Sequence, residues 1–147
     1  MLSKSTEYAI RALVFIQLCN WEQKRPGVGE IAKEIEAPEA YAAKILQTLT
    51  KNKLLNSMKG RGGGFFFDEN QSNLSLYDVI HVVEGDASFH KCGFGLKQCN
   101  DENPCPFHDK YKVLRGGFLD IVKTETIKSF SEKIVHGEAV LNNVIQT

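Results

Sequence analysis

Residues 38–67, PEAYAAKILQTLTKNKLLNSMKGRGGGFFF, contain a helix pattern followed directly by a glycine-rich hairpin pattern. In its first half, apolar side chains recur at i, i+3, i+4 and i+7 (Ala42, Ile45, Leu46 and Leu49), which predicts a helix to about Asn52 with one face on the core. Pro38 suits the start of this helix, because the first helical position needs no N–H donor. The face predicted to meet solvent comprises Glu39, Ala40, Ala43, Lys44, Gln47 and Lys51.

The second half of the stretch predicts a two-stranded hairpin. A strand over 54–58 leads into the tip 59–64, and a second strand follows over 65–67. Glycines at the tip allow φ > 0 and let backbone N–H groups approach a phosphate closely, while two side chains add positive charge; the tip residues that matter are Lys59, Arg61, Gly62 and Gly63. A short helix is predicted just before, over 29–36. Two short helices and a hairpin together indicate a winged helix-turn-helix.

On both sides of this stretch the chain is predicted to be mainly α-helical. Apolar periodicity indicates helices over 4–19 and 76–84, and a long helix from Lys110 whose apolar stripe is interrupted by Gly116 and Gly117. Each of those glycines costs a helix about 1 kcal/mol relative to alanine. Glycines and prolines in 86–109 predict a loop without regular structure, and 131–147 fits either helix or strand. We therefore predict a DNA-binding unit over 1–85, a cysteine-containing loop over 86–109, and a dimerisation helix with a tail over 110–147.

Charge is unevenly distributed along the 147 residues, although the net charge is zero. The segment 44–61 contains five Lys or Arg and no acid, a local charge of +5; the segment 62–109 contains eight carboxylates and two lysines, a local charge of −6. A basic segment inside folded structure indicates a contact with phosphate. There is neither a signal-peptide pattern nor an apolar run of about 18 residues, so a cytoplasmic location without membrane contact is expected.

Three of the four cysteines form a group with the spacing C-x6-C-x5-C-x2-H, made of Cys92, Cys99, Cys105 and His108. Without an export signal, such a group indicates a metal or redox site rather than structural disulfides. Thiolates are the usual ligands of iron–sulfur clusters, three cysteines and one histidine also suit tetrahedral zinc, and a thiol switch is a third alternative. Spacing alone hardly separates cluster from zinc. Cys19 stands among apolar neighbours and is expected to be a core thiol.

Several short motifs are shared with a known family. They are EYAIRAL at 7–13, EIA at 30–32, Tyr41, KIL at 44–46, Leu49, GRGGGF at 60–65, and the three cysteines followed by His108. On these residues the chain resembles the Rrf-two family of bacterial winged-helix transcription regulators, over about residues 1–130. The family includes the iron–sulfur-cluster assembly regulator, the nitric-oxide-sensing repressor and the cysteine-metabolism repressor.

The resemblance implies a homodimer that binds double-stranded DNA at an inverted-repeat operator. The helix over 38–52 would enter the major groove, the hairpin would contact the neighbouring backbone or minor groove, and the long C-terminal helix would pair two subunits. It also implies a 2Fe–2S or 4Fe–4S cluster on the three cysteines, which purified protein can lack. His108 has the position of the fourth ligand in the cluster-assembly regulator. Glu7 aligns with the acidic fourth ligand of the nitric-oxide sensor, supplied there by the other subunit.

Two classes of function follow. The first is a DNA-binding regulator that senses redox state, nitric oxide or iron–sulfur status through a cluster, or through a zinc or thiol switch. The second is a metal-binding or electron-carrying protein that does not bind DNA. The basic helix and hairpin favour the first, because an electron carrier has no need for them. No nucleophile–base pattern or phosphate-binding enzyme motif is present, so an enzyme is not expected.

Overall fold

Three helices build the first half of the computed structural model, which describes residues 2–142. They are α1 (Lys4–Trp21), α2 (Val28–Glu34) and α3 (Glu39–Lys51). Ser3 caps α1, since its Oγ accepts a hydrogen bond from the Thr6 N–H at 3.1 Å. The three helices bury their apolar stripes against one another, and Leu13, Ile31 and Leu49 are fully buried at their centre.

The predicted helix-turn-helix is confirmed, with small shifts at its boundaries. α2 begins one residue earlier than predicted and ends at Glu34 rather than at 36. Pro38 is the residue before the first turn of α3, with φ −58° and ψ 137°, so the helix proper starts at Glu39. Pro38 therefore precedes the helix by one residue and does not occupy the first helical position predicted for it.

The predicted hairpin is also present, as antiparallel strands β1 (Asn56–Met58) and β2 (Gly64–Phe66) with Ser57 opposite Phe65. The first strand is shorter than predicted, and the second has the predicted length but lies one residue earlier, because Leu55 and Phe67 turn into the core, where they are 2% and 4% exposed. At the tip, the Gly63 N–H donates to the Gly60 carbonyl at 3.0 Å. Gly60, Gly62 and Gly64 all have positive φ, which is the reason this turn needs glycine.

Helix α4 (Leu76–Val83) follows a single 3-10 turn over Gln71–Asn73 and confirms the helix predicted there. A reciprocal pair of hydrogen bonds between Ser75 and Asp78 caps its first turn. The buried side chains of Val79 and Ile80 then join the core formed by α1 and α3. These contacts attach α4 to the helix-turn-helix, and the cysteine loop begins shortly after it.

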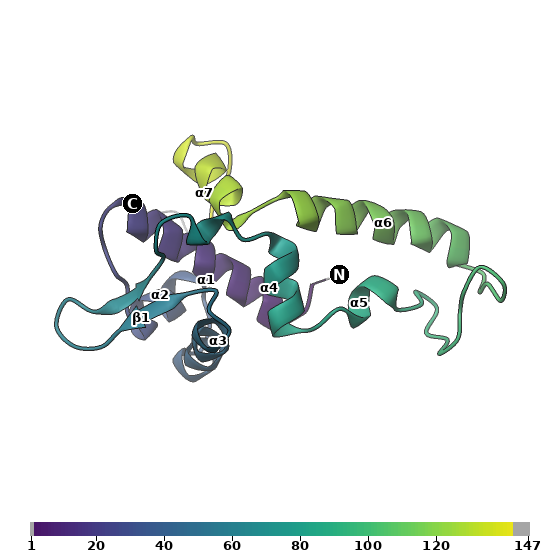
Figure 1. Cartoon of the computed structure of the whole chain (residues 1–147), viewed down its shortest axis with the longest axis horizontal. Helices are drawn as coiled ribbons and strands as arrows, with labels where there is room; N and C mark the ends of the chain where they lie inside the picture. The colour runs from purple at the N-terminus through teal and green to yellow at the C-terminus, as the bar shows by residue number, and fades with distance from the viewer. Residues whose placement is uncertain (1, 143–147) are drawn as a thin grey trace.

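The cysteine loop and the long helix differ from the prediction in two ways. Residues Ala87–His90 form a four-residue helix, α5, where no regular structure was predicted. The long helix α6 (His108–Thr124) starts at His108 rather than at Lys110, and it runs unbroken through Gly116 and Gly117. Figure 1 shows α6 projecting away from the helix-turn-helix unit, with the cysteine loop at its far end.

Helix α7 (Ile127–Val135) resolves the ambiguous C-terminal region as helix up to Val135. Hydrogen bonds between Thr126 and Ser129 cap its start, and it packs on α1 through the fully buried Ile127. Residues 143–147, for which helix and strand had both been considered, lie outside the described residues. Among the described residues, no helix is both long and apolar enough to cross a membrane.

Candidate functional site

The outer face of α3 presents the side chains predicted to meet DNA. Glu39, Ala40, Lys44, Gln47 and Lys51 are exposed, and Ala43 is half-buried. Ala40, Lys44, Gln47 and Lys51 are spaced at i, i+4, i+7 and i+11, so they follow the line on the helix opposite its buried face. This exposed line thus carries two lysines, a side-chain amide and one small residue, groups of the kind that can contact base edges and phosphates.

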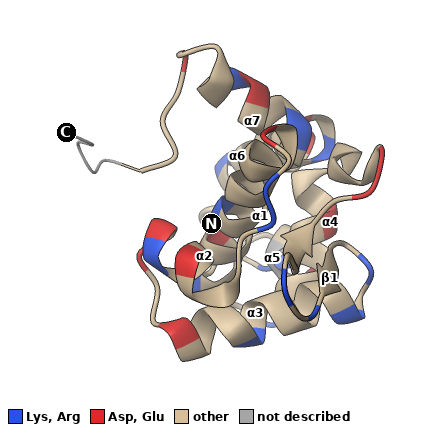
Figure 2. Ribbon diagram, turned by 90° about the vertical axis from the view of Figure 1, so that its left-hand side faces the viewer, with Lys and Arg blue, Asp and Glu red and all other residues tan. Residues whose placement is uncertain are grey.

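The wing tip carries the second basic group. Lys59, Arg61 and Gly62 are exposed and Gly63 is half-buried. Lys and Arg segments of α3 and of the loop beside β1 lie at the same end of the molecule (Figure 2). Within residues 2–142, neither Lys59 nor Arg61 forms an ion pair, and the same holds for the lysines of α3. Their charges are therefore available to phosphate.

Arg25 is a residue of this surface that the sequence did not reveal. Its guanidinium lies 4.0 Å from the centroid of the Phe66 ring and donates to Met58 Sδ at 3.2 Å, so one side chain contacts both strands of the wing. The neighbouring Pro26 carbonyl accepts a hydrogen bond from the Phe65 N–H at 2.9 Å. The loop before α2 thus holds the wing from the side. In the sequence, only the basic pair Lys24 and Arg25 before Pro26 could have indicated this contact with the wing.

The three clustered cysteines converge at the start of α6. Their Sγ atoms all lie within 4.8 Å of one another. Cys92 Sγ and Cys105 Sγ are 3.5 Å apart, and the Cys105 N–H points to Cys99 Sγ at 3.3 Å. Cys105 is buried and the other two thiols are half-buried. Close sulfurs that also receive a backbone N–H form a donor set suited to a metal ion or a cluster.

His108 lies beside the three thiols and offers a fourth ligand atom. Its Nδ1 lies 3.4 Å from Cys99 Sγ, and its Nε2 lies 2.8 Å from Asp101 Oδ1. Lys112 Nζ contacts both oxygens of the same carboxylate, at 2.9 and 3.1 Å. The hydrogen bond from His108, followed by the bond and the charge of Lys112, lowers the pKa of Asp101 to about 2. Asp101 and Lys112 were not predicted, although the i, i+4 spacing of His108 and Lys112 on one helix is a signal.

The surroundings of Cys92 and Cys99 shift the pKa values of these two thiols in opposite directions. Burial acts to raise the pKa of Cys92, but backbone hydrogen bonds at Leu96 and Phe94, together with the other two thiols, lower it to about 6. For Cys99, the Cys105 N–H acts to lower the pKa, and burial with the neighbouring thiols outweighs it, so the pKa is raised. Cys92 is thus more ready than Cys99 to act as a thiolate ligand at neutral pH.

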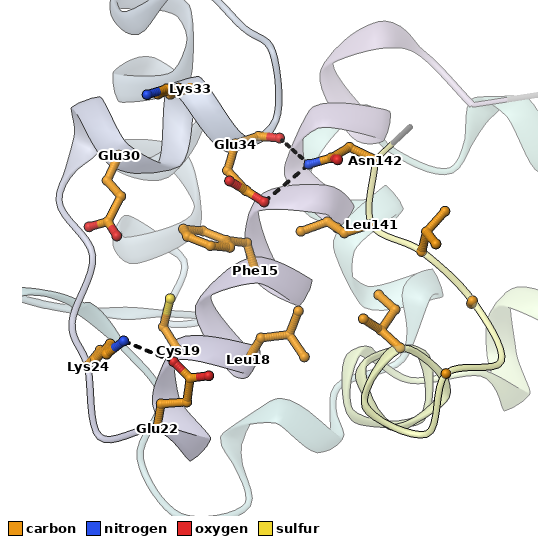
Figure 3. Close-up of a pocket in the computed structure, with 14 residues that line it drawn as sticks. Phe15, Leu18, Cys19, Glu22, Lys24, Glu30, Lys33, Glu34, Leu141 and Asn142 are labelled. Carbon is orange, nitrogen blue, oxygen red and sulfur yellow. Dashed lines mark hydrogen bonds and ion pairs between the residues drawn. The ribbon is translucent and has the colours of Figure 1, made fainter. Parts of the chain in front are cut away.

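Two other residues considered as ligands lie elsewhere in the chain. Glu7 is exposed on α1, with its carboxylate 3.7 Å from Lys4 Nζ, and it does not belong to the three-thiol group. Cys19 is 7% exposed and lines a groove of about 1040 Å³ between α1, α2 and residues 137–142 (Figure 3). Burial, followed by the charges of Glu30 and Glu22, raises the pKa of Cys19 to about 11, so this thiol stays protonated.

Comparison with known proteins agrees with the fold and identifies the family. The family model Rrf2, described as an iron-dependent transcriptional regulator, matches residues 2–133. The regulator NsrR of Oceanobacillus iheyensis is 30% identical, with 86% of each chain covered. The regulator IscR of Pectobacterium atrosepticum is 24% identical, over 96% of this chain and 82% of its own. The solved structure of CymR, the global cysteine regulator of B. subtilis, superposes with a TM-score of 0.72 at 18% identity, over 90% of this chain and 96% of that one.

The family model covers nearly the whole described chain, and its relatives are named as regulators of transcription. The winged helix-turn-helix, the basic face of α3 and the three-cysteine group are the features expected of such a protein. We conclude that this chain belongs to the Rrf2 family of transcription regulators, which bind DNA and are not enzymes.

Proposed function

We propose that this regulator reads an inverted repeat in double-stranded DNA as a homodimer, with α3 in the major groove and the wing on the adjacent backbone or minor groove. Lys44 is the side chain assigned to a base edge, with guanine preferred, because it lies on the exposed line of α3. Lys59 and Arg61 are assigned to phosphate or groove charge. Two such units related by a two-fold axis bind half-sites about one helical turn apart.

The exposed apolar face of α6 supports the dimer. Val113, Leu114 and Ile121 are 76%, 57% and 56% exposed, and Gly117 lies between them on the same face. The first half of α6 projects from the body, and a single amphipathic helix of this length with two glycines is only marginally stable in water. A second copy packed on this face would bury these side chains.

The sensing part of the proposal is carried by one observation, the convergence of three Sγ atoms and His108 Nδ1 at the start of α6. We assign Cys92, Cys99 and Cys105 as cluster ligands and His108 as the preferred fourth ligand, because it already lies beside the thiols. Glu7 of a second copy is the alternative. When bound, a cluster supplies chemistry that responds to oxidation, nitric oxide or iron supply.

The chain's own residues offer a route from this site to DNA. The loop contacts one face of α6, and the proposed dimer contact uses the opposite face. A shift of α6 that follows a change at the thiols would alter the spacing of the two α3 helices. A small difference in affinity between the two arrangements is enough to change the DNA-bound population.

The test is purification and reconstitution without oxygen. Wild-type protein is expected to be coloured and to contain iron and sulfide, and alanine at any of the three clustered cysteines should abolish both. Cys19→Ala is the matched control and should leave them unchanged. Replacing His108 with alanine should alter the absorption spectrum more than replacing Glu7 does, and the reverse result would transfer the fourth ligand to Glu7.

A single tetrahedral metal ion is the second candidate, and two distances between the ligand atoms in the structure favour it. One zinc ion with Zn–S bonds of about 2.3 Å separates its ligand atoms by roughly 3.8 Å. The observed contacts of 3.5 Å between Cys92 and Cys105, and 3.4 Å between Cys99 and His108, are close to that separation. Colourless protein with one tightly bound zinc per chain, even after reconstitution with iron and sulfide, would replace the cluster with zinc and leave the DNA-binding proposal intact.

A further inference from the structure

The imidazole of His108 is held between two different partners, one on each ring nitrogen. Nδ1 faces Cys99 Sγ at 3.4 Å and Nε2 faces Asp101 Oδ1 at 2.8 Å, and the side chain is only 9% exposed. A carboxylate accepts but does not donate when ionised, so it selects the tautomer with the proton on Nε2. That tautomer leaves the Nδ1 lone pair directed at the thiol group, where a ligand is needed.

Asp101 is itself fixed in place by local structure. The side-chain oxygen of Asn100 accepts hydrogen bonds from the N–H groups of Glu102 and Asn103, both at 2.9 Å, which closes a tight turn around Asp101. Lys112, one helical turn after His108, bonds both carboxylate oxygens from the other side. The carboxylate therefore bridges two side chains of α6 while belonging to the loop.

We propose that Asp101 is a positioning residue for the metal site: it orients His108 so that Nδ1 is the ligand atom. This proposal rests on the proposed function only in assuming that the three cysteines and His108 bind a metal. Histidine ligands commonly donate their second N–H to a carboxylate, and losing that partner typically costs about 10- to 100-fold in metal affinity or activity.

Other contacts on the same face of α6 also hold the cysteine loop against this helix. Arg115 donates to the Lys91 carbonyl at 2.8 Å, next to Cys92. The Tyr111 ring lies so close to Gly93 that a Cβ there would be 2.7 Å from it. The loop is thus attached to α6 before the first cysteine and at two points between the cysteines. Because Asp101 is 73% exposed, its loss removes this orientation without opening the core, and the protein is expected to stay folded.

The experiment titrates Co²⁺ into full-length apoprotein without oxygen and follows the thiolate and ligand-field absorption bands. Asp101→Asn is expected to bind Co²⁺ about 10-fold more weakly than wild type, with shifted ligand-field bands. Glu102→Gln removes the same charge from the next residue, whose side chain makes no hydrogen bond or ion pair within residues 2–142, and should match wild type. In a His108→Ala background, the effect of Asp101→Asn should disappear.

The outcomes separate the two proposals. If wild type binds Co²⁺ through thiolates and Asp101→Asn binds it with the same affinity and the same bands, the positioning role is wrong and the metal site stands. An undiminished loss of affinity in the His108→Ala background would also overturn it, because Asp101 would then act on the loop and not through the imidazole. If wild type shows no thiolate band at all, the proposed metal site and the positioning role both fail, and the DNA-binding proposal is unaffected.

Discussion

Replacing Gly117 by alanine tests whether α6 packs against a second copy of the chain. Gly117 lies at the centre of the exposed apolar face, four residues from Val113 and four from Ile121. A Cβ at this position meets nothing within 4 Å in the single chain. Gly116 is an internal control, because it has the same open surroundings but lies among charged side chains such as Asp120 and Lys123.

The expected magnitudes differ for helix stability and for dimerisation. Either substitution should stabilise α6 by about 1 kcal/mol, because alanine loses less backbone entropy than glycine in a helix. At a close helix–helix contact, an inserted methyl group costs about 1 kcal/mol or more through overpacking. A two-fold interface contains the residue twice, so Gly117→Ala should weaken the dimer by about 2 kcal/mol, or roughly 30-fold in Kd.

Sedimentation equilibrium over a range of concentrations measures the dimer Kd, and circular dichroism during heating measures the stability of the helix. We expect Gly116→Ala to keep the wild-type Kd and to unfold at a higher temperature. Gly117→Ala should also raise the unfolding temperature of the helix, but its dimer should dissociate at a higher protein concentration than the wild-type dimer. If Gly117→Ala dimerises as tightly as wild type, or if both variants weaken the dimer equally, α6 does not pair through this face.

Four further predictions concern the wing, α3 and the core thiol. Neutralising Lys59 or Arg61 should weaken binding to all DNA sequences alike and reduce the slope of log K against log salt by about 1 for each, measured by fluorescence anisotropy. Lys44→Ala should relax base preference at one position of each half-site in selection from random DNA, and an equal loss for every sequence would reassign Lys44 to phosphate. Gly64→Ala should lower DNA affinity with little change in helix content, because φ is +143° and the new Cβ would lie 2.3 Å from a backbone carbonyl oxygen of the loop before α2. Because the pKa of Cys19 is about 11 against an ordinary 9.0, its alkylation at pH 8 should be about 100-fold slower than that of a free thiol. The contribution of the protonated Cys19 thiol to the free energy of unfolding should be complete below pH 9 and decline between pH 9 and 11.

The DNA-binding half was predictable because its signals are local. Helix periodicity fixes which face of α3 is buried, and the buried set Ala42, Ile45, Leu46 and Leu49 is the one expected from spacing alone. The wing followed from its glycines, since Gly60 and Gly62 adopt the positive φ that other residues avoid. The errors lie at element ends, where burial of Leu55 and Phe67 outweighs strand pairing.

Three features of this regulator could be recognised from residue types and their spacing: the basic helix face, the glycine wing, and a group of three cysteines with one histidine. The sequence did not determine which of these groups meet. Tertiary structure alone placed Arg25 on Phe66 across the wing, and it alone brought Asp101 to His108 and Lys112 at the start of α6. Periodicity and turn chemistry act over a few residues, whereas a contact between a loop and a helix depends on the path of the whole backbone between them.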